Sequence, residues 1–426
     1  MPFVTGSIGA TLGKCMKIGI ILHQKKFFGG GPRLVLELAH ALKHIGHGVT
    51  LYTFAHVEDD RASFGDRAQG LRVVTLPSGT DLKRRPFWGM FYIPGTNAIR
   101  QYLQENRLAK MLARKIERDT DALLPQTSRI DLITAYYFKR LHKKETTIIW
   151  QMNDIITPTF KACYTESWTK NSCSFPQKLW YSFLDRFDHH YLSAADEITV
   201  LAEMIVKQAR KSIKRHTTIV HLGVNAEQFA YKERGHPQGK IRLLAHAQFY
   251  RHRRFEDAVE ATALLVKKGY DVDLTLSGDS ETYEAYRKYR DEIREKARIL
   301  GIADRVHFPG RPSDTEYVET LHASDIFIFP HVRQSWGLVP FEAMATGLPI
   351  VASDQTGASE VLIDGETALI VPAEKPQAIA NAVERLIQNK ELYSKLSKNG
   401  AVWVRKELTW NNYARALVRL IEKHRQ

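Results

Sequence analysis

The chain of 426 residues is 44% hydrophobic and 25% charged, which is typical of a globular protein with room for two domains of roughly 200 residues each. Its three cysteines lack metal spacing and argue against a zinc or disulfide framework, and no apolar run reaches the roughly 18 residues that a membrane-spanning helix needs. The sequence therefore favours a cytoplasmic protein. Residues 1–15 lack the pattern of a signal peptide, and we expect them to form a loose extension.

The formal net charge of +14 is concentrated in the first half of the chain. Residues 1–224 hold 32 lysines and arginines against 19 acidic residues, whereas residues 225–426 are nearly balanced. This asymmetry indicates an anionic partner, such as a phosphorylated acceptor, a lipid headgroup surface or a nucleic acid, or else only a soluble basic surface. Because no recognised nucleic-acid-binding module accompanies the charge, we do not expect nucleic-acid binding.

Strand and helix patterns alternate from Met16 onward. MKIGIIL predicts a strand, FFGGGP at residues 27–32 a turn, PRLVLELAHALKHIG a helix and GVTLYTF a second strand. Four later runs are also strand-like: DLITAYY, TTIIWQM, EITVLA and TTIVHLG. PQKLWYSFLDRFDHHYLSAA predicts an amphipathic helix. Such alternation is typical of a parallel sheet that helices cover on both faces.

A second series of the same kind begins near Ile241. IRLLAHA, VDLTLSGD, VHFPG, IFIFP and PIVASD predict strands, while FEDAVEATALLVKKG and residues 281–300 predict helices. Apolar periodicity is lost at residues 225–239, where we place the join. The predicted fold class is α/β with two doubly wound parallel-sheet units and a basic amphipathic helix at the end: residues 16–224, 225–408 and 409–426. Ligands of such sheets bind beyond the carboxyl ends of the strands, so we expect the site in the cleft between the units.

Two loops could bind phosphate. Gly30 and Gly31 precede a helix, where glycines let backbone N–H groups approach an anion, although the GGG spacing alone favours a tight turn. RHRRFED, residues 251–257, follows the strand IRLLAHA. Guanidinium groups at a strand end can grip a diphosphate, and this position favours phosphate binding over a basic loop paired with its own Glu256 and Asp257.

The stretch SWGLVPFEAM carries the most specific signal. Pro340 suits the first position of a helix, and Glu342 then lies in the first turn, where the helix dipole favours an anion. The backbone of residues 337–339 could bind phosphate at the same helix start, with the carboxylate of Glu342 beside it for a ribose diol. A loop with Gly357 and Glu360 follows the next strand.

These motifs, in this order, resemble glycosyltransferase family 4, whose members are retaining, metal-independent enzymes of the GT-B fold. The resemblance covers nearly all of the chain from Met16 and is most specific between Asp325 and Pro372. The stretches Ala195–Leu201 and Gly223–Phe229 match the family as well. The resemblance implies two facing Rossmann-like domains, a nucleotide diphosphate sugar as the donor substrate, and neither a cofactor nor a metal.

The resemblance also assigns roles to residues. Glu342 would bind the nucleotide ribose, and Arg253, aided by Arg251, would neutralise the diphosphate leaving group. The implied catalytic residues are Arg253, Gln334 and Asp154. The implied donor-binding residues are Gly30, Gly31, Arg251, Arg253, Gln334, Trp336, Gly337, Leu338, Val339 and Glu342.

Three positions depart from the family's pattern. Gln334 stands where the first glutamate of a pair is usual, Gln248 where an arginine is usual, and Asn153 with Asp154 where many members have a His-Asp or His-Glu pair. Gln334 keeps hydrogen-bonding capacity and could still hold a sugar hydroxyl. Arg251 or Arg254 could replace the cation missing at Gln248. The chain thus resembles a subfamily with glutamine in place of the first glutamate.

We expect a hexose to move to a glycan, lipid-linked or phosphorylated acceptor in cell-envelope or surface polysaccharide synthesis. The resemblance implies attack from the face that the nucleotide leaves, with a donor phosphate oxygen helping to take the proton, so no protein nucleophile is required. In LKRRPFWGMFYIP, residues 82–94, basic and aromatic residues are combined as at an anionic membrane interface, or form a loop packed on its own domain. The first reading implies peripheral contact with the inner face of the membrane.

Two other functions remain open. The changes at Gln334 and Gln248 would suit a noncatalytic GT-B protein that binds a nucleotide sugar or a partner. A nucleotide-sugar epimerase with the same architecture is the second alternative. Binding without transfer would indicate the first, and conversion of the donor without an acceptor would indicate the second.

Overall fold

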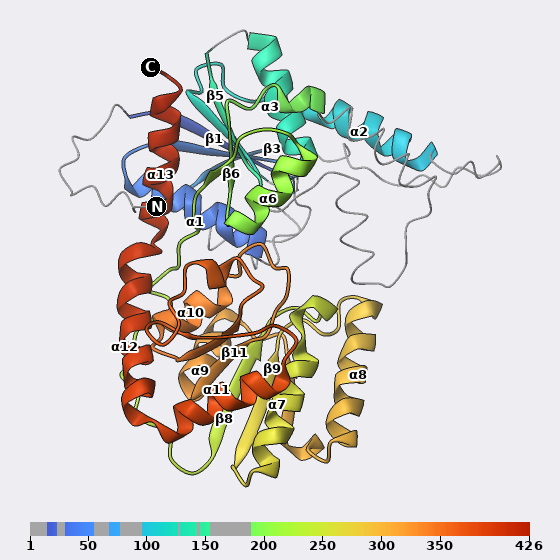
Figure 1. Cartoon of the computed structure of the whole chain (residues 1–426). Helices are drawn as coiled ribbons and strands as arrows, with labels where there is room; N and C mark the ends of the chain where they lie inside the picture. Colours follow the sequence, from blue (N-terminus) through green and yellow to red (C-terminus); the bar gives the residue numbers. More distant parts are fainter. Residues whose placement is uncertain are drawn as a thin grey trace.

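The structure is a computed structural model that describes residues 15–23, 30–54, 68–76, 96–126, 128–142, 145–153 and 189–426. These residues form two parallel β-sheets, each flanked by helices, and Figure 1 shows the two domains one above the other. This confirms the predicted α/β fold of two parallel-sheet units. Among the described helices, none combines the length and the apolar composition that crossing a bilayer requires.

The sheet of the N-terminal domain has seven strands in the order β3-β2-β1-β4-β5-β6-β7. They are β1 (Lys17–Leu22), β2 (Gly48–Thr53), β3 (Arg72–Thr75), β4 (Ala122–Pro125), β5 (Thr147–Gln151), β6 (Glu197–Val200) and β7 (Thr218–Ile219). Every residue of β4, β5 and β6 is buried, as expected of strands that helices cover on both faces. The strand order reverses beside β1, and beyond the carboxyl ends of the strands such a reversal opens a crevice.

The described helices of this domain form two layers. They are α1 (Gly30–His44), α2 (Thr96–Ala113), α3 (Arg129–His142) and α6 (Glu203–Ser212). Helix α1 packs on β1 and β2, whereas α3 packs on β1 and β4 and carries α2 on its outer side. The start of α1 therefore lies at the end of β1 that faces the other domain, which is the end where the crevice forms (Figure 1).

The sheet of the C-terminal domain has six strands in the order β10-β9-β8-β11-β12-β13. They are β8 (Ile241–His246), β9 (Val272–Ser277), β10 (Val306–Gly310), β11 (Ile326–Phe329), β12 (Ile350–Ser353) and β13 (Leu369–Val371). All paired neighbours are parallel. Pro309 lies in β10, an edge strand, where a residue without an N–H donor is tolerated.

Helices and short 3-10 turns complete the C-terminal domain. They are η3 (Arg251–Arg253), α7 (Phe255–Lys267), α8 (Glu284–Ile299), η4 (Ala303–Arg305), α9 (Asp314–Ala323), α10 (Val339–Ala345), η5 (Ala358–Glu360), α11 (Pro376–Gln388), α12 (Lys390–Glu407) and α13 (Trp410–Lys423). Helix α7 packs on α8 and α11, and α10 packs on β11, β12 and α12.

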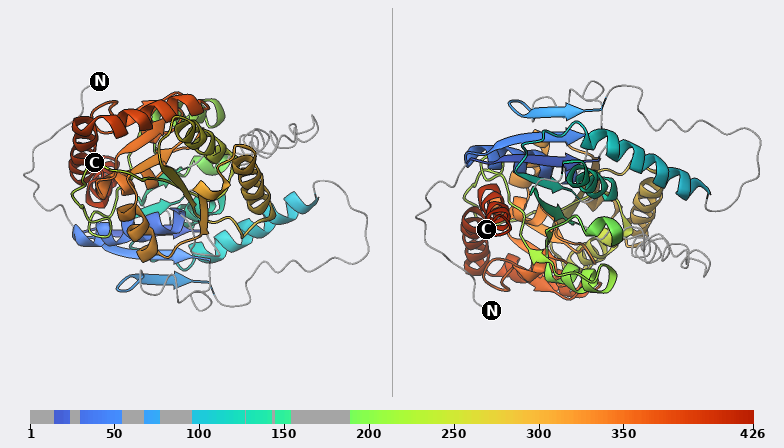
Figure 2. Two further views of the ribbon diagram at one scale, coloured as in Figure 1. Left: turned by 90° about the horizontal axis from the view of Figure 1, so that it is seen from below. Right: turned by 90° about the horizontal axis from the view of Figure 1, so that it is seen from above.

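Helix α13 belongs to the N-terminal domain by its contacts. It packs on α1 and β5, and Figures 1 and 2 show α12 and α13 following one side of both domains. The Tyr413 hydroxyl donates to Oε1 of Gln151 at 3.3 Å, which ties α13 to the end of β5. A Cβ atom on Gly223 would lie 2.2 Å from the backbone N of Trp410, so a glycine is required where the two linking segments cross.

The apolar core is continuous between the domains. One buried cluster runs through the N-terminal domain and extends into the C-terminal domain through Phe229, Trp336 and Phe341, while a second cluster lies around α7 and α11. The predicted domain boundary after Val224 stays a prediction, although the two sheets fall on either side of it: β7 ends at Ile219 and β8 begins at Ile241.

Two expectations about local structure are wrong. DLITAYY lies inside helix α3, and the strand of this region is β4. A short apolar run does not distinguish a strand from a buried helix, and α3 is buried on most of its surface because it lies between the sheet and α2. A turn is expected at residues 27–32, but Gly30, Gly31 and Pro32 already belong to helix α1. Phe27 to Gly29 lie outside the described residues.

Candidate active site

The turn between β11 and α10, residues 330–338, is held in an unusual backbone conformation at the carboxyl end of β11. Arg333 has φ +53° and Gly337 has φ +105°, both in the left-handed region. A Cβ atom on Gly337 would lie 2.6 Å from Cζ of Phe329. Position 337 thus requires glycine for conformation and for space, and the turn stays in close contact with its strand.

Gln334 meets two side chains at this turn. Nη1 of Arg253 donates to Oε1 of Gln334, and Nδ1 of His331 lies 2.6 Å from the same oxygen. Burial, strengthened by the positive charge of Arg253, holds the pKa of His331 well below its ordinary value, so the imidazole is neutral. Gln334 accepts a hydrogen bond from Arg253. A glutamate at this position would neutralise the guanidinium charge, whereas the uncharged amide does not.

Glu342 is the other candidate site residue near this turn, and it is almost fully buried at 2% exposure. It lies in the first turn of α10, where Pro340 occupies one of the first two positions, as the sequence predicts. Nη1 of Arg33 lies 2.9 Å from its Oε1. Since Arg33 belongs to α1 and Glu342 to α10, this ion pair joins the two domains across the cleft.

Arg33 has two further contacts with the segment that links the domains. Its Nη2 donates to Oε1 of Gln228 at 3.3 Å, and its guanidinium carbon lies 5.1 Å from the ring centre of Phe229. A buried carboxylate requires such a positive partner. In the sequence Arg33 lies two residues after the last glycine of the GGG motif, but nothing in the sequence pairs it with Glu342.

An aromatic wall lies beside this ion pair. The rings of His246, at the end of β8, and Tyr317, in α9, are stacked with their centres 4.1 Å apart. Burial and the nearby charge of Arg33 lower the pKa of His246 to about 3. Burial, followed by the charge of Glu342, raises the pKa of Tyr317 well above its ordinary value. Both rings are therefore neutral, and sequence analysis missed both because neither lies in a recognisable motif.

The three arginines of RHRRFED point to different partners. Only Arg253 reaches Gln334. Arg251 pairs with Glu292 of α8, and Arg254, with φ +52°, pairs with Asp257 at 2.8 Å at the start of α7. The structure therefore separates Arg251 from Arg253, which the sequence expected to act together.

Gln248 is exposed. The guanidinium of Arg254 is already paired with Glu256 at 3.0 Å as well as with Asp257, so its charge is compensated within its own loop. Of the two arginines that could replace the cation missing at Gln248, neither points at Gln334 in this structure.

The remaining expected site residues divide into three groups. Trp336 is buried between His221 and Phe341, with ring centres 4.8 and 4.9 Å away, so its indole is part of the core. Leu338 caps α10 and Val339 is its first residue, while Gly30 and Gly31 begin α1. Asp154 lies outside the described residues.

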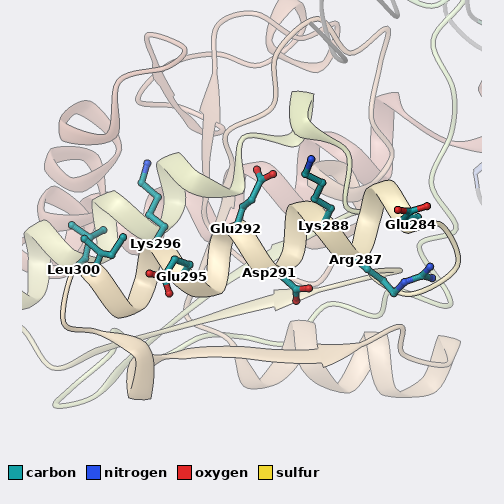
Figure 3. Close-up of a pocket in the computed structure, with 9 residues that line it drawn as sticks. Glu284, Arg287, Lys288, Asp291, Glu292, Glu295, Lys296 and Leu300 are labelled. Atoms are coloured by element: carbon teal, nitrogen blue, oxygen red, sulfur yellow. The ribbon is translucent and has the colours of Figure 1, made fainter. Parts of the chain in front are cut away.

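A cavity of about 450 Å³ lies between the domains beside the Arg33–Glu342 pair, and its walls include Arg33, Gln228 and Asp314. A larger hollow of about 830 Å³ follows the outer surface of α8, and Figure 3 shows that its lining, from Glu284 to Leu300, comes from that helix and its end. No residue of the β11–α10 turn lines this larger hollow. Within the described ranges, no three histidine, cysteine or carboxylate side chains are grouped to hold a metal ion.

Comparison with known proteins gives the class of this chain. Residues 227–403 match the family model described as Glycosyl transferases group 1. Mannosylfructose-phosphate synthase of Agrobacterium fabrum (strain C58 / ATCC 33970) is 22% identical over 415 residues, which is 92% of this chain and 86% of that protein. Alpha-1,3/1,6-mannosyltransferase ALG2 of Dictyostelium discoideum is 23% identical over 447 aligned positions, covering 95% of this chain and 97% of that protein.

Among solved structures, Anabaena Alr3699/HepE in complex with UDP and glucose superposes with a TM-score of 0.70 at 14% identity, covering 96% of this chain and 100% of that one. The two parallel-sheet domains are therefore those of the GT-B fold. With the family match of residues 227–403, they define the chain as a glycosyltransferase enzyme.

Proposed function

We propose that this chain is a retaining, metal-independent hexosyltransferase that uses a nucleotide diphosphate sugar, and that it represents a form of glycosyltransferase family 4 with Gln334 in place of the first glutamate. The observation that carries the proposal is the placement of Arg253 and Glu342. Both flank the β11–α10 turn at the carboxyl end of the sheet, and Glu342 faces α1 of the other domain. That arrangement supplies a cation for a diphosphate and a carboxylate for a ribose on either side of one turn.

Glu342 would bind the ribose of the donor nucleotide. In this structure its Oε1 is paired with Arg33. A carboxylate can accept several hydrogen bonds, so a diol can share it with, or displace, the guanidinium. The UDP and glucose bound in the similar Anabaena structure support a nucleotide sugar as the class of donor.

Arg253 would stabilise the leaving diphosphate. Cleavage of the sugar–phosphate bond develops negative charge on the phosphate, and fixed cations and N–H dipoles are the groups that stabilise it. The backbone of Gly337, Leu338 and Val339 adds N–H groups at the start of α10. The acceptor oxygen would attack from the face that the nucleotide leaves and pass its proton to a donor phosphate oxygen.

Gln334 would hold a hydroxyl of the transferred sugar. Its Oε1 is already engaged by Arg253 and lies beside His331, and its Nε2 lies close to Gly337, since a Cβ there would be 3.2 Å away. The amide is thus fixed in orientation before a sugar binds, which favours precise positioning. A catalytic role for Asp154 remains part of the proposal, although that residue lies outside the described ranges.

The acceptor is proposed to be a glycan, lipid-linked or phosphorylated molecule that binds to the basic N-terminal domain. Relatives named as a mannosylfructose-phosphate synthase and as an alpha-1,3/1,6-mannosyltransferase support phosphorylated and glycan acceptors. The basic and aromatic stretch 82–94, which lies outside the described residues, would give peripheral contact with the inner face of the membrane. A role in envelope or surface polysaccharide synthesis follows from these acceptors.

A turnover assay tests the proposal. UDP-, GDP- and ADP-linked hexoses are incubated with the full chain and with extracts of phosphorylated and lipid-linked glycans, and products are followed by mass spectrometry. Transfer with retained anomeric configuration in the presence of a chelator would support the proposal. Donor binding without transfer would indicate a noncatalytic binding protein, and conversion of a donor without acceptor would indicate an epimerase.

A further inference from the structure

The loop between β12 and β13 begins with residues 354–360, and this segment touches both domains. One end runs along the β11–α10 turn, where the backbone N of Arg333 donates to O of Gln355 at 2.8 Å and that of Gly357 donates to O of Gln334 at 2.9 Å. The other end is η5, which finishes at Glu360. Two main-chain hydrogen bonds, one to Arg333 and one to Gln334, therefore join this segment to the β11–α10 turn.

The carboxylate of Glu360 is bound to the N-terminal domain. Its Oε2 accepts from the backbone N of Glu203 at 2.6 Å, and its Oε1 accepts from that of Met204 at 2.8 Å. These are the first two residues of α6. The first N–H groups of a helix have no partner within the helix, and a carboxylate placed there also interacts favourably with the helix dipole.

The sequence around α6 supplies no local substitute for this contact. The residue at the N-cap position is Ala202, which has no side-chain oxygen, and no side-chain cap is formed. Serine, threonine, aspartate and asparagine are the residues that usually cap a helix from this position. The cap of α6 is instead delivered from the other domain by Glu360, 157 residues further along the chain.

Gly357 lies where the loop meets both the β11–α10 turn and the residue before α6, and there is no room for a side chain at this position. A Cβ atom on it would lie 2.0 Å from O of Ser335 and 2.8 Å from Cβ of Ala202. The loop is thus wedged between the β11–α10 turn and the residue that precedes α6. This second contact is independent of Glu360 and joins the same two elements.

We propose that Glu360 is a positioning residue that couples α6 of the N-terminal domain to Gln334. When the two domains are in contact, this coupling holds the β11–α10 turn, and with it Gln334, in the position that binds the donor sugar. The inference deepens the proposed function, since it takes Gln334 as a residue that contacts the sugar. Glu360 itself touches no substrate, and it acts through the loop that shares main-chain hydrogen bonds with the β11–α10 turn.

The contact is tested first without any ligand, by hydrogen exchange of the full chain. Glu360→Ala is expected to speed exchange of the amides of Glu203 and Met204 by roughly fivefold or more, because the cap protects them. Glu366→Ala is the matched control, since that exposed glutamate pairs with Lys395 within its own domain. Equal exchange in wild type and Glu360→Ala would overturn the inference.

The coupling is tested by kinetics with UDP-glucose and GDP-mannose. Glu360→Ala is expected to lower kcat/KM for the accepted donor roughly tenfold, while UDP or GDP alone, which lacks the sugar, binds within about twofold of wild type. Glu360→Gln keeps one acceptor oxygen and should recover part of the loss. A merely structural role would weaken nucleotide and sugar nucleotide alike.

The two proposals fail in different ways. Faster exchange at α6 with unchanged turnover would overturn the coupling and leave the proposed function standing. A wild-type chain that binds none of UDP, GDP and ADP and turns over no hexose linked to any of them would overturn the proposed function, and the coupling would fall with it.

Discussion

Nη1 of Arg33 and Oε1 of Glu342 lie 2.9 Å apart, and they belong to different domains. The carboxylate that the family resemblance assigns to the donor ribose is therefore held by a cation from the opposite side of the cleft. The pair compensates the charge of Glu342 in its buried position, and under the proposed function it would make the N-terminal domain part of the donor site.

The first prediction concerns this pair. Arg33→Gln should lower the free energy of unfolding by about 2 kcal/mol, because Glu342 then stays buried without its cation. The double change Arg33→Gln with Glu342→Gln should recover much of that loss, since two amides leave no buried charge. Urea unfolding of the four proteins measures the coupling. If the two single effects simply add in the double variant, the ion pair contributes nothing to stability.

The second prediction concerns Gln334. Gln334→Ala should lower kcat/KM by roughly tenfold, because one hydrogen bond to a sugar hydroxyl and the anchor of Arg253 are both lost. Gln355→Ala is the matched control, as only the backbone of this exposed glutamine contacts the turn. Steady-state kinetics with the accepted donor measures kcat/KM for both variants and for wild type. Identical kinetics for both variants would remove Gln334 from the site.

The third prediction compares two glycines of similar backbone conformation. Gly337 and Gly269 have φ +105° and +89°, but only at Gly337 would a Cβ meet another residue, Phe329 at 2.6 Å. Alanine at either position costs about 1 kcal/mol for the left-handed backbone, and Gly337→Ala should cost at least that much again through the clash. Thermal and urea unfolding measure both. Equal losses at the two positions would show that the turn relaxes freely away from β11.

The fourth prediction is a pH dependence. Burial, together with the charge of Arg253, lowers the pKa of His252 to about 2, whereas an unfolded histidine titrates near 6.5. Below pH 6.5 the unfolded chain therefore binds a proton that the folded chain does not, and stability falls as the pH falls. His252→Gln should remove up to about 1.4 kcal/mol per pH unit of this loss between pH 6 and 4. Parallel stability curves for wild type and variant would contradict the assignment.

Repeating strand and helix patterns predict most of the architecture, because apolar residues recur with a different spacing in strands and in helices. The exception, DLITAYY, is informative. Its apolar positions suit a strand, but α3 is covered by the sheet on one side and α2 on the other, so it needs apolar residues nearly all round. Only the packing of other segments distinguishes the two.

The site could be predicted in part. Sequence motifs locate Arg253 and Gln334 after strands and Glu342 at the start of a helix. Ligands of such sheets bind at these positions. The pairing of Arg33 with Glu342 and of Glu360 with α6 depends on how two domains meet. Residues more than 150 positions apart make these contacts, and local periodicity carries no information about them.

Isothermal titration of the full chain with UDP-glucose, GDP-mannose and ADP-glucose tests the central claim most directly, when wild type is compared with Glu342→Gln and with the surface control Glu366→Ala. The account predicts that one nucleotide sugar binds wild type and control alike and binds Glu342→Gln at least roughly tenfold more weakly, because a charged acceptor for the ribose is lost. Equal affinity of Glu342→Gln and wild type for that donor would contradict the placement of the donor site at the β11–α10 turn.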